Sequence, residues 1–402
     1  MFKSASAYRT LTTLIKKRSL AGKRVLVRAD LNAPIAHGMI ESEYRLLALQ
    51  PTLDLLIQEK ATVIIATHIG RPVDNDESLS TKQLIPWFTQ HGYTIIFAKN
   101  AEAAYAMSLE KKQQIIMMEN LRFFVGEKTQ DGIFAQQLAQ LGDYYVNDAF
   151  ATLHRADTSI ACVPYLFPPH HRCIGLLIEK ELIQIESFIN QSKHPRVCMI
   201  GGGKAADKIP LLMQMLDIID RVLLCPALVF NFLYAQGLPV GLSLVDKRLK
   251  PLCLALLEKA HKKKIQMLFP VDYYVSHNSF ICPLEPLPVP ADALQPNMVG
   301  VTIGPATVAL YSDYLASAGS ILINGLMGDI NRADTIASSS ALFKIVAENK
   351  TAARIIGGGD SVAIVEQQGL MKTIGSLSTG GGSLLALIAG KELPGLTPFE
   401  LA

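Results

Sequence analysis

The chain has 402 residues, of which 50% are hydrophobic and 18% are charged, and its formal net charge is +3. This composition is typical of folded globular domains and excludes a largely disordered chain, while so small a net charge argues against wholesale binding of nucleic acid. No apolar run reaches the roughly 18 residues of a membrane-spanning helix, so we expect two globular domains with neither a nucleic-acid nor a membrane partner.

The cysteines indicate the cellular compartment. The chain contains six cysteines, none with C-x-x-C spacing, and several of them stand in apolar, strand-like runs. Such cysteines are typical of reduced thiols, and we therefore expect a cytoplasmic protein. The segment Met1–Arg18 is basic and rich in serine and threonine, which leaves a transit peptide as an alternative.

Strand-like and helix-like segments alternate along the chain. The first such segments are Arg24–Leu31, Glu43–Lys60, Ala61–His68, Thr81–Gly92 and Tyr93–Lys99. This alternation predicts βαβ units and an α/β fold with two Rossmann-like, three-layer α/β/α domains whose sheets are mostly parallel. A long helical segment without a preceding breaker, Ile174–Lys193, is interpreted as the helix that joins the two domains.

In the first half of the chain, polar and basic residues follow the ends of the predicted strands. They are Asp30, Asn32, Arg45, His68, Arg71, Arg122, His154 and Arg155. Each of them alone fits an ordinary ion pair or cap. Together they predict a site for a small ligand with several negative charges, because guanidinium groups that converge on one sheet edge repel one another unless an anion lies among them.

In the second half of the chain, the predicted strands are followed by three glycine triplets and not by arginines. They are Gly201–Gly203, Gly357–Gly359 and Gly380–Gly382, each between an apolar strand and a helical run. Such turns let backbone N–H groups and the following helix N-terminus approach phosphate oxygens. Lys204 and Lys208 are four residues apart, on one face of the first two turns of the predicted helix, where a cation is unfavourable without an anion.

Two other phosphate-binding classes were weighed. Gly201, Gly203 and Ala206 satisfy the dinucleotide pattern, but the next strand, Arg221–Leu228, does not end in the acidic residue that this pattern requires. No P-loop sequence occurs in the chain. The pattern favours phosphoryl transfer between a nucleotide and a small anionic acceptor, with Asp360 as a candidate ligand for Mg²⁺ that bridges phosphates.

Motifs along nearly the whole chain match one family in order. They are VLVRADLN, THIGRP, MENLRFFVGE, YVNDAFATLHRA, IGGGKAADKI, NGLMG, IIGGGDSVA and LSTGGGSLLALIAGKELPGL. From about Leu14 to Leu396 the chain resembles the phosphoglycerate kinases. The resemblance implies a glycolytic kinase that moves a phosphoryl group between ATP and the carboxyl group of 3-phosphoglycerate. Nothing in the sequence demands more than a monomer. Mg²⁺ is the implied cofactor.

The resemblance also implies domain roles. Residues 1–180 would form the domain that binds 3-phosphoglycerate, with residues 391–402 packing back on it, and residues 181–390 would bind the nucleotide. The long helix and the C-terminal segment would act as hinges for domain closure. In the first domain Asp30 and Asn32 would contact the glycerate end of the substrate. The remaining substrate-binding positions would be His68, Arg71, Arg122, His154 and Arg155.

The same resemblance assigns roles in the second domain. Arg45, from the first domain, would join Lys208, Gly381 and Gly382 as the catalytic groups around the moving phosphoryl group. Lys204 and Asn324 would contact the nucleotide phosphates, and Asp360 would hold the Mg²⁺. The other nucleotide-binding positions, beside Lys208 itself, would be Gly203, Gly304, Asn331, Gly359 and Ser361.

The chain departs from the family pattern around the expected nucleoside pocket. Cys225–Ala227 stands where the family has glycines, and Leu326 replaces the proline of NGPMG. Asn331 replaces a ribose-binding glutamate, with Asp329 two residues before it. Three hypotheses follow: an active kinase with a remodelled nucleoside pocket, a kinase of altered nucleotide preference, or a catalytically silent protein that binds phosphoglycerate.

Overall fold

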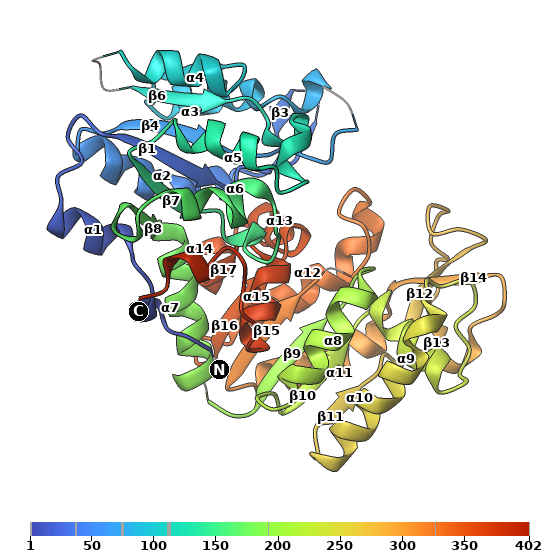
Figure 1. Ribbon diagram of the computed structural model, residues 1–402. Coiled ribbons are helices and arrows are strands. Elements are labelled where there is room, and N and C mark those ends of the chain that lie inside the picture. The colour runs from blue at the N-terminus through green and yellow to red at the C-terminus, as the bar shows by residue number, and fades with distance from the viewer. Residues whose placement is uncertain are drawn as a thin grey trace. The chain divides into compact units, whose positions relative to one another are not determined.

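A computed structural model describes residues 2–36, 38–73, 76–110, 114–191, 193–325 and 327–401. The substitution at Leu326 lies outside the described residues. The chain divides into two compact units. Unit 1 comprises Met1–Ile183 and Glu392–Ala402, and unit 2 comprises Gln184–Lys391. Each unit contains a parallel sheet with helices, which confirms the predicted α/β class (Figure 1).

The sheet of unit 1 has six strands in the order β5-β6-β4-β1-β7-β8, all paired in parallel. The strands are β1 (Arg24–Ala29), β4 (Thr62–Ala66), β5 (Ile95–Ala98), β6 (Ile115–Met118), β7 (Tyr144–Asp148) and β8 (Arg172–Ile174). A separate hairpin pairs β2 (Ile35–Ala36) with β3 (Met39–Ile40). Because β1 lies between β4 and β7, the carboxyl ends of these three strands meet at one edge of the sheet.

Both faces of this sheet are buried. On β1, Val25 and Val27 belong to a core cluster together with Leu49 and Leu53 of the helix α2, whereas Leu26 points to the opposite face and is also buried. Successive residues of a strand alternate between the two faces, so continuous apolar strands require cover on both sides. This explains why the strand segments are mostly apolar.

Seven α-helices of the described chain begin within unit 1, and several start at a side-chain cap. They are α1 (Leu11–Lys17), α2 (Tyr44–Gln58), α3 (Ile85–Gln90), α4 (Ala101–Ser108), α5 (Gly132–Ala139), α6 (Thr158–Ala161) and α7 (Leu176–Gln191). Asn100 and Asp131 accept hydrogen bonds from backbone N–H groups of α4 and α5, which fixes where these helices begin. Buried Asp148 does the same for α7, accepting from Leu177 and Ile178.

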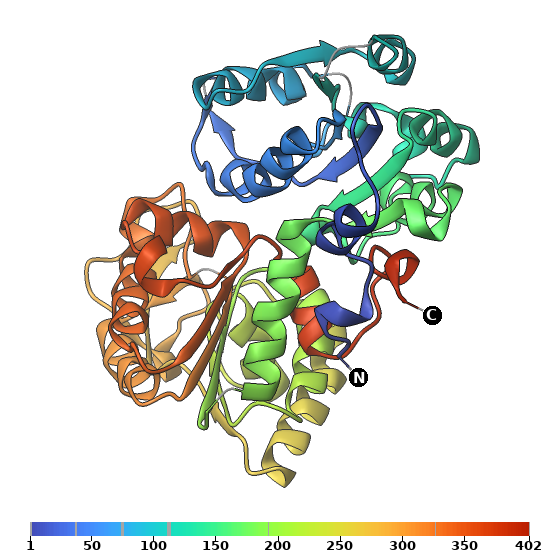
Figure 2. The same ribbon diagram turned by 90° about the vertical axis from the view of Figure 1, so that its left-hand side faces the viewer.

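The two ends of the chain meet in unit 1, as Figure 2 shows. Tyr8 forms an antiparallel bridge with Glu400, and the N–H of Leu401 donates to the carbonyl of Ala7. The C-terminal segment therefore folds with the N-terminal unit.

The main sheet of unit 2 also has six strands, in the order β11-β10-β9-β15-β16-β17. They are β9 (Arg196–Ile200), β10 (Arg221–Leu224), β11 (Gln266–Leu268), β15 (Ser320–Asn324), β16 (Ala353–Gly357) and β17 (Leu377–Ser378), and all neighbours are parallel. The three glycine triplets begin at or within two residues of the ends of β9, β16 and β17. β9 and β16 flank β15, and β17 lies beside β16 in the same parallel sheet, so their glycine turns share an edge.

A second, antiparallel sheet in unit 2 was not predicted from the alternation. It has the order β13-β12-β14, formed by β12 (Asp272–His277), β13 (Val289–Pro290) and β14 (Met298–Ile303). The proline-rich segment between β12 and β14 contains β13. The alternation of strands and helices predicts only parallel crossovers and therefore missed this sheet.

Helices lie on both sides of the main sheet of unit 2, with the orange helix α12 on one side and the yellow helix α10 on the other (Figure 2). The helices are α8 (Ala205–Met215), α9 (Leu228–Ala235), α10 (Lys250–Lys262), α11 (Pro305–Ala316), α12 (Ala333–Glu348), α13 (Gly359–Gln367), α14 (Met371–Ile374) and α15 (Gly381–Ile388). Among the described residues of the whole chain, no helix has the length and apolar character needed to cross a membrane.

Candidate active site

The basic residues of unit 1 gather around His68, which follows β4. The imidazole is buried, and burial together with the charges of Arg28, Arg122, Arg155 and Arg45 lowers the pKa of His68 well below its ordinary value. The ring is therefore neutral at pH 7. The guanidinium groups around it repel one another, and an anion bound among them would relieve that repulsion.

Arg45 is held in place by Asp30. Asp30 follows β1 and is buried, and it forms an ion pair with Arg45 in the first turn of α2. Burial, aided by the nearby charge of Arg155, lowers the pKa of Arg45 to about 10, although Glu181 acts in the opposite direction. Arg45 therefore remains charged at pH 7, and its guanidinium group is oriented before any ligand binds.

The loop after β4 is built from hydrogen bonds that involve Asn32, Asn120 and Arg122. The side-chain oxygen of Asn32 accepts from the N–H of Gly70 at 2.7 Å, and Arg122 donates to the Gly70 carbonyl. Asn120 accepts from the N–H of Arg122 at 3.0 Å and donates to the carbonyl of Ile69 at 2.8 Å. The Nε of Arg122 is buried and has no hydrogen-bond partner among the described residues, which leaves one donor for a ligand oxygen.

Arg71 and Arg155 complete the basic cluster. The charges of Arg155 and Arg71 contribute to the lowered pKa of Arg122, which burial brings to about 10, and Arg71 also lowers the pKa of Arg155. These side chains are therefore close enough for their charges to interact. Arg71 is exposed, as is His154, which directly precedes Arg155. The structure thus brings Arg45, His68, Arg71, Arg122 and Arg155 close together at one edge of the sheet of this unit.

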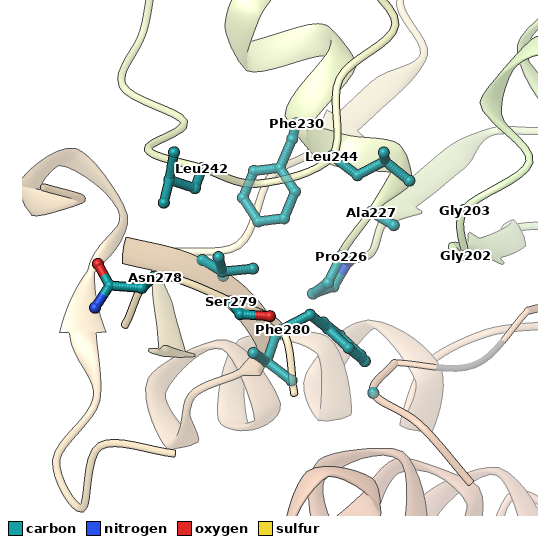
Figure 3. A pocket seen from close by; sticks show the side chains of 14 residues that line it. Gly202, Gly203, Pro226, Ala227, Phe230, Leu242, Leu244, Asn278, Ser279 and Phe280 are labelled. Atoms are coloured by element: carbon teal, nitrogen blue, oxygen red, sulfur yellow. The ribbon is translucent and has the colours of Figure 1, made fainter. Parts of the chain in front are cut away.

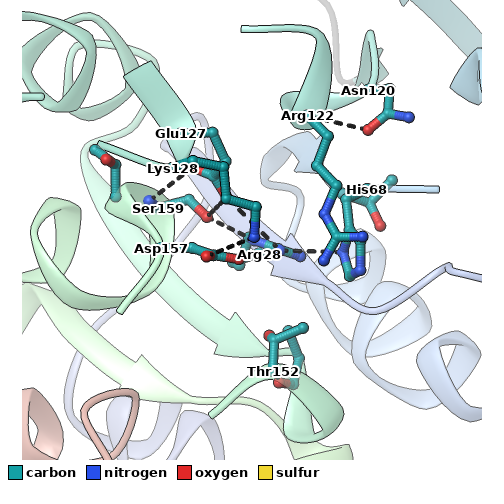
Figure 4. A network of polar contacts seen from close by, with 12 residues as sticks. Arg28, His68, Asn120, Arg122, Glu127, Lys128, Thr152, Asp157 and Ser159 are labelled. Atoms are coloured by element: carbon teal, nitrogen blue, oxygen red, sulfur yellow. Dashed lines mark hydrogen bonds and ion pairs between the residues drawn. The ribbon is translucent and has the colours of Figure 1, made fainter. Parts of the chain in front are cut away.

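A buried network of polar side chains holds the ring of His68 in place (Figure 4). Fully buried Arg28 donates through Nε to Ser159 Oγ at 2.8 Å, and its guanidinium group lies 3.9 Å from Glu127. It also lies 3.3 Å from Nδ1 of His68. A guanidinium group can only donate, so Nδ1 accepts and the proton of the neutral ring resides on Nε2. The imidazole can then offer an N–H to an anion without carrying charge.

In unit 2 the ammonium group of Lys208 lies among glycines. It donates to the carbonyl of Gly201 at the end of β9. A Cβ atom on Gly202 would lie 3.3 Å from the ammonium nitrogen, and one on Gly325 would lie 2.7 Å from it. Both glycines have positive φ, 88° and 102°, which disfavours other residues. Burial, followed by the charge of Lys204, lowers the pKa of Lys208 to about 8.

Two further glycine turns come together at the end of β15. The side-chain nitrogen of Asn324 donates to the carbonyl of Gly381 at 3.1 Å. A Cβ atom on Gly381 would lie 3.1 Å from that nitrogen and 3.2 Å from the Cα of Gly358. Gly381 and Gly382 open α15. The absence of side chains here leaves backbone N–H groups near the edge of the sheet, as a phosphate site requires.

Three helices begin at these turns. Gly203 and Lys204 are exposed immediately before α8, and Gly359 is the first residue of α13. Lys204 is the N-cap of α8, outside the helix, whereas the sequence predicts it within the helix. The hydroxyl of Ser361 is buried in α13 and has no hydrogen-bond partner among the described residues. Helix N-termini and an unpartnered donor both favour phosphate oxygens.

Asp360 suits Mg²⁺ only together with phosphates. It is an exposed residue in the first turn of α13, beside the glycine turn. Among the described residues no group of three or more histidine, cysteine, aspartate or glutamate side chains is arranged to hold a metal. Mg²⁺ is usually held by one or two carboxylates plus substrate phosphates and water, so a single exposed carboxylate fits this ion when a nucleotide is bound.

A cavity of about 650 Å³ opens beside the first glycine turn of unit 2 (Figure 3). It is lined by Gly202, Gly203, Pro226, Ala227, Phe230, Leu242, Leu244, Asn278, Ser279, Phe280, Val299, Gly300, Val301 and Gly328. The lining side chains are apolar except for those of Asn278 and Ser279. The size and the aromatic walls suit a flat nitrogen base.

Ala227 in this lining is strained. Its φ of 61° and ψ of −52° lie in a region that glycine adopts without cost and alanine does not. We expect Ala227→Gly to raise the free energy of unfolding of unit 2 by about 1 kcal/mol, because relief of strain exceeds the added flexibility of the unfolded chain. Differential scanning calorimetry would measure it. Ala309→Gly, in the exposed middle of α11, is the matched control and should lower the free energy of unfolding. If both variants lower it equally, the backbone of Ala227 is not strained.

Of the predicted nucleotide-binding residues, all of which the structure describes, only Gly203 lines the cavity, and Asn331 and Gly304 do not. The side-chain amide and the N–H of Asn331 both donate to Asp329 Oδ1, at 3.1 Å and 3.0 Å. Gly304 follows β14 and is packed against the carboxylate of Asp272, whose atoms would clash with a Cβ atom there. The cavity lining contains Gly328 and residues of β14 in place of Asn331 and Gly304.

Several residues that build the site were missed by the sequence analysis. Arg28 and Glu127 were not assigned to the site, although they stand in the recognised motifs VLVRADLN and MENLRFFVGE. Ser159, in α6, lies outside these motifs and gave no signal. Asn120 stands two residues before Arg122 in a motif that was recognised, so it could have been named. The cavity walls come from apolar residues that the sequence alone cannot distinguish from core.

Comparison with known proteins agrees with this arrangement. The sequence model of the family described as phosphoglycerate kinase matches residues 15–391. Phosphoglycerate kinase of Trichodesmium erythraeum is 35% identical over 391 residues, which are 96% of this chain and 98% of the relative. The cytosolic phosphoglycerate kinase 3 of Arabidopsis thaliana is 35% identical over 395 residues, which are 96% of this chain and 98% of that relative.

A solved structure extends the similarity to the fold. Phosphoglycerate kinase from Coxiella burnetii superposes with a TM-score of 0.75 at 30% sequence identity, covering 97% of this chain and 98% of that chain. The basic strand ends of unit 1 and the glycine turns of unit 2 thus occur on a chain that these proteins match nearly from end to end, and the chain belongs to the phosphoglycerate kinase family.

Proposed function

We propose that the protein transfers the γ-phosphoryl group of ATP reversibly to the carboxylate of 3-phosphoglycerate, forming ADP and 1,3-bisphosphoglycerate. Its family makes it a phosphotransferase with a carboxyl group as acceptor. The observation that carries the proposal is the ammonium group of Lys208, which lies half-buried among Gly201, Gly202 and Gly325. A half-buried cation surrounded by glycine backbone is arranged for a phosphoryl oxygen.

Unit 1 would bind the acceptor. Arg71, Arg122 and Arg155 supply charge for the 3-phosphate, and neutral His68 supplies an N–H from Nε2. Arg45, oriented by its ion pair with buried Asp30, would face the carboxylate that attacks. The loop that Asn32 fixes lies at the same sheet edge. Planar guanidinium groups match the oxygens of phosphate and carboxylate, so the site favours a small acid with both groups.

Unit 2 would bind the donor. The glycine turns beside Lys204, Asn324 and Gly381 present backbone donors to the phosphates, with Gly359 and Ser361 at the start of α13. Asp360 would hold Mg²⁺, which neutralises part of the phosphate charge when it is bound. Removal of divalent ions should therefore abolish transfer.

The transfer itself needs no covalent enzyme intermediate. A carboxylate oxygen of 3-phosphoglycerate forms a bond to the γ-phosphorus while the bond from that phosphorus to the bridging oxygen of ATP breaks, and ADP leaves with the electron pair. The carboxylate is ionised at pH 7, so no general base is required. The chain contributes position and positive charge, with Lys208 and Arg45 stabilising the equatorial oxygens.

The cavity of unit 2 would hold the nucleoside, and its lining suggests weak selection among bases. An apolar pocket discriminates modestly between purines, whereas a site that hydrogen-bonds a base edge can discriminate by several orders of magnitude. We expect the kcat/KM values for ATP, GTP and ITP to lie within roughly tenfold of one another. Steady-state assays with each nucleotide would measure this. A preference for ATP of several hundredfold would show that the base edge is read.

The proposal as a whole is tested by a coupled assay with 3-phosphoglycerate, Mg²⁺ and each nucleotide. ADP formation that depends on 3-phosphoglycerate supports an active kinase, and strong activity with another nucleotide alone supports altered preference. The silent alternative predicts binding of 3-phosphoglycerate by calorimetry without turnover. A cytoplasmic monomer is part of the proposal, and the cytosolic Arabidopsis relative supports the compartment.

A further inference from the structure

Two loops of unit 2 form facing parts of the cavity wall. One follows β12 and contributes Asn278, Ser279 and Phe280, and the other precedes α12 and contributes Gly328. Phe280 presents its ring to the cavity (Figure 3), although 38% of the residue is exposed. An aromatic ring on an exposed loop makes an effective wall only if the loop is held still.

Arg332 connects these two loops. Its guanidinium group donates to the carbonyl of Phe280 and, at 3.1 Å, to the carbonyl of Cys282. It also forms an ion pair with Asp334 at 2.9 Å, and its central carbon lies 6.0 Å from the centre of the Phe280 ring. One side chain thus contacts the backbone on both sides of Ile281 and the ring that faces the cavity.

The position of Arg332 is not explained by its own helix. It occupies the N-cap of α12, but its side chain makes no capping hydrogen bond. The turn before α12 is closed by Thr335, which accepts from the N–H of Asp329 at 2.8 Å and donates to the carbonyl of Arg332 at 2.9 Å. The guanidinium group therefore reaches the other loop while it also pairs with Asp334 in the first turn of α12, and 19% of the side chain remains exposed.

We propose that Arg332 is a positioning residue for nucleotide binding: it holds Phe280 as one wall of the base pocket, so that a purine base meets a fixed ring. This inference rests on the proposed function, because it takes the cavity as the nucleoside site. Arg332 itself would not contact the phosphates, since its guanidinium group is engaged by two carbonyls and Asp334. Arg332 would therefore affect the binding of the base and not the binding of the phosphates.

The test separates the two parts of the nucleotide. Adenosine and inorganic pyrophosphate are titrated separately by calorimetry into the wild-type protein and into Arg332→Ala. Loss of a tether to one loop should raise the Kd of adenosine roughly three- to tenfold, while the Kd of pyrophosphate stays unchanged. In steady state the KM for ATP should rise by a similar factor with kcat nearly constant.

Arg354→Ala is the matched control. Arg354 also donates to two backbone carbonyls of α12, those of Val346 and Ala347 near the other end of the helix. Its loss should lower thermal stability without changing the affinity for adenosine. If the control weakens adenosine as much as Arg332→Ala does, the effect is one of general stability and the inference is overturned.

Phe280→Ala provides a second test that does not depend on the tether variant. It should weaken adenosine binding, and adding Arg332→Ala to it should cause little further loss, because the two residues act through one contact. Additive losses would contradict the inference. An Arg332→Ala protein with unchanged adenosine affinity would also contradict it. If wild-type protein binds pyrophosphate but not adenosine, the nucleoside assignment of the cavity fails, which is a different result.

Discussion

Replacement of Arg45 by alanine is expected to lower kcat about 10²- to 10³-fold while changing the KM for 3-phosphoglycerate much less. Arg45 remains charged at pH 7 and is oriented by its ion pair with buried Asp30 before substrate binds. Its charge therefore requires little reorganisation when negative charge shifts onto the transferring oxygens. Steady-state kinetics with saturating ATP would measure both constants.

Two companion variants make the result interpretable. Arg45→Lys keeps the charge but cannot form two parallel hydrogen bonds, so it should recover only part of kcat. Arg24→Ala removes an arginine at the opposite end of β1, where it pairs with Asp143, and should leave kcat unchanged. A normal kcat in Arg45→Ala would remove this residue from the transfer step. The substrate site itself would survive that result, because the other arginines remain.

Lys208→Ala is expected to have an effect on kcat of the same order, about 10²- to 10³-fold. The ammonium group is half-buried among glycine turns, close to Gly202 and Gly325, where the proposed transfer takes place. Lys259→Ala, which removes a lysine that bonds the carbonyl of Met213 away from these turns, is the control and should leave kcat unchanged. Loss of kcat in both variants would point to misfolding of unit 2.

The pH dependence of the same residue gives an independent test. The pKa of Lys208 is about 8 in the folded protein, so its ammonium group loses its proton as the pH rises through 8. We expect kcat/KM for ATP to fall above about pH 8, since this ratio reports the free enzyme. In Lys208→Arg the fall should move to a higher pH, because an arginine stays protonated. A flat profile up to pH 9.5 would contradict the lowered pKa.

Unlike kcat/KM, the free energy of unfolding should rise as the pH increases above about 8. The pKa of Lys208 is lower in the folded state than the 10.5 of an ordinary lysine, so below pH 8 the folded protein bears the full penalty of a buried charge. Between about pH 8 and 10.5 only the unfolded chain keeps this proton, and the free energy of unfolding gains a contribution that rises with pH. Lys208→Met should be more stable at pH 7 by about 2 kcal/mol, and the difference should shrink at pH 10.

The parallel sheets and the gathering of arginines could be predicted because both follow from local patterns. Apolar strands alternate with helices, and parallel strands end at a common edge, so Asp30, His68 and Arg122 were expected to meet there. The structure adds the buried side chains that hold these residues in position. The bond from Arg28 to His68 and the pairing with Glu127 join residues that lie far apart in the sequence, and no spacing in the sequence encodes such contacts.

For the nucleoside pocket, the sequence predicted only that this chain differs from the family pattern. The sequence shows side chains at Cys225–Ala227 where glycines were expected, and it indicates a hindered pocket. The structure instead contains a cavity of about 650 Å³ with Pro226 and Ala227 in its wall. Its other walls come from the antiparallel sheet and the loop around Phe280, which the alternation of strands and helices did not predict. The positive φ of Ala227 also lies beyond sequence patterns, because alanine rarely adopts it.

The central claim is that this chain moves a phosphoryl group from a nucleoside triphosphate to the carboxylate of 3-phosphoglycerate. Phosphorus NMR of the protein with ATP, Mg²⁺ and 3-phosphoglycerate follows the group directly. We predict a new acyl-phosphate resonance together with ADP, and neither signal in Lys208→Ala on the same timescale. ATP, GTP and ITP that all remain intact beside folded protein, with 3-phosphoglycerate bound but unchanged, would contradict the account.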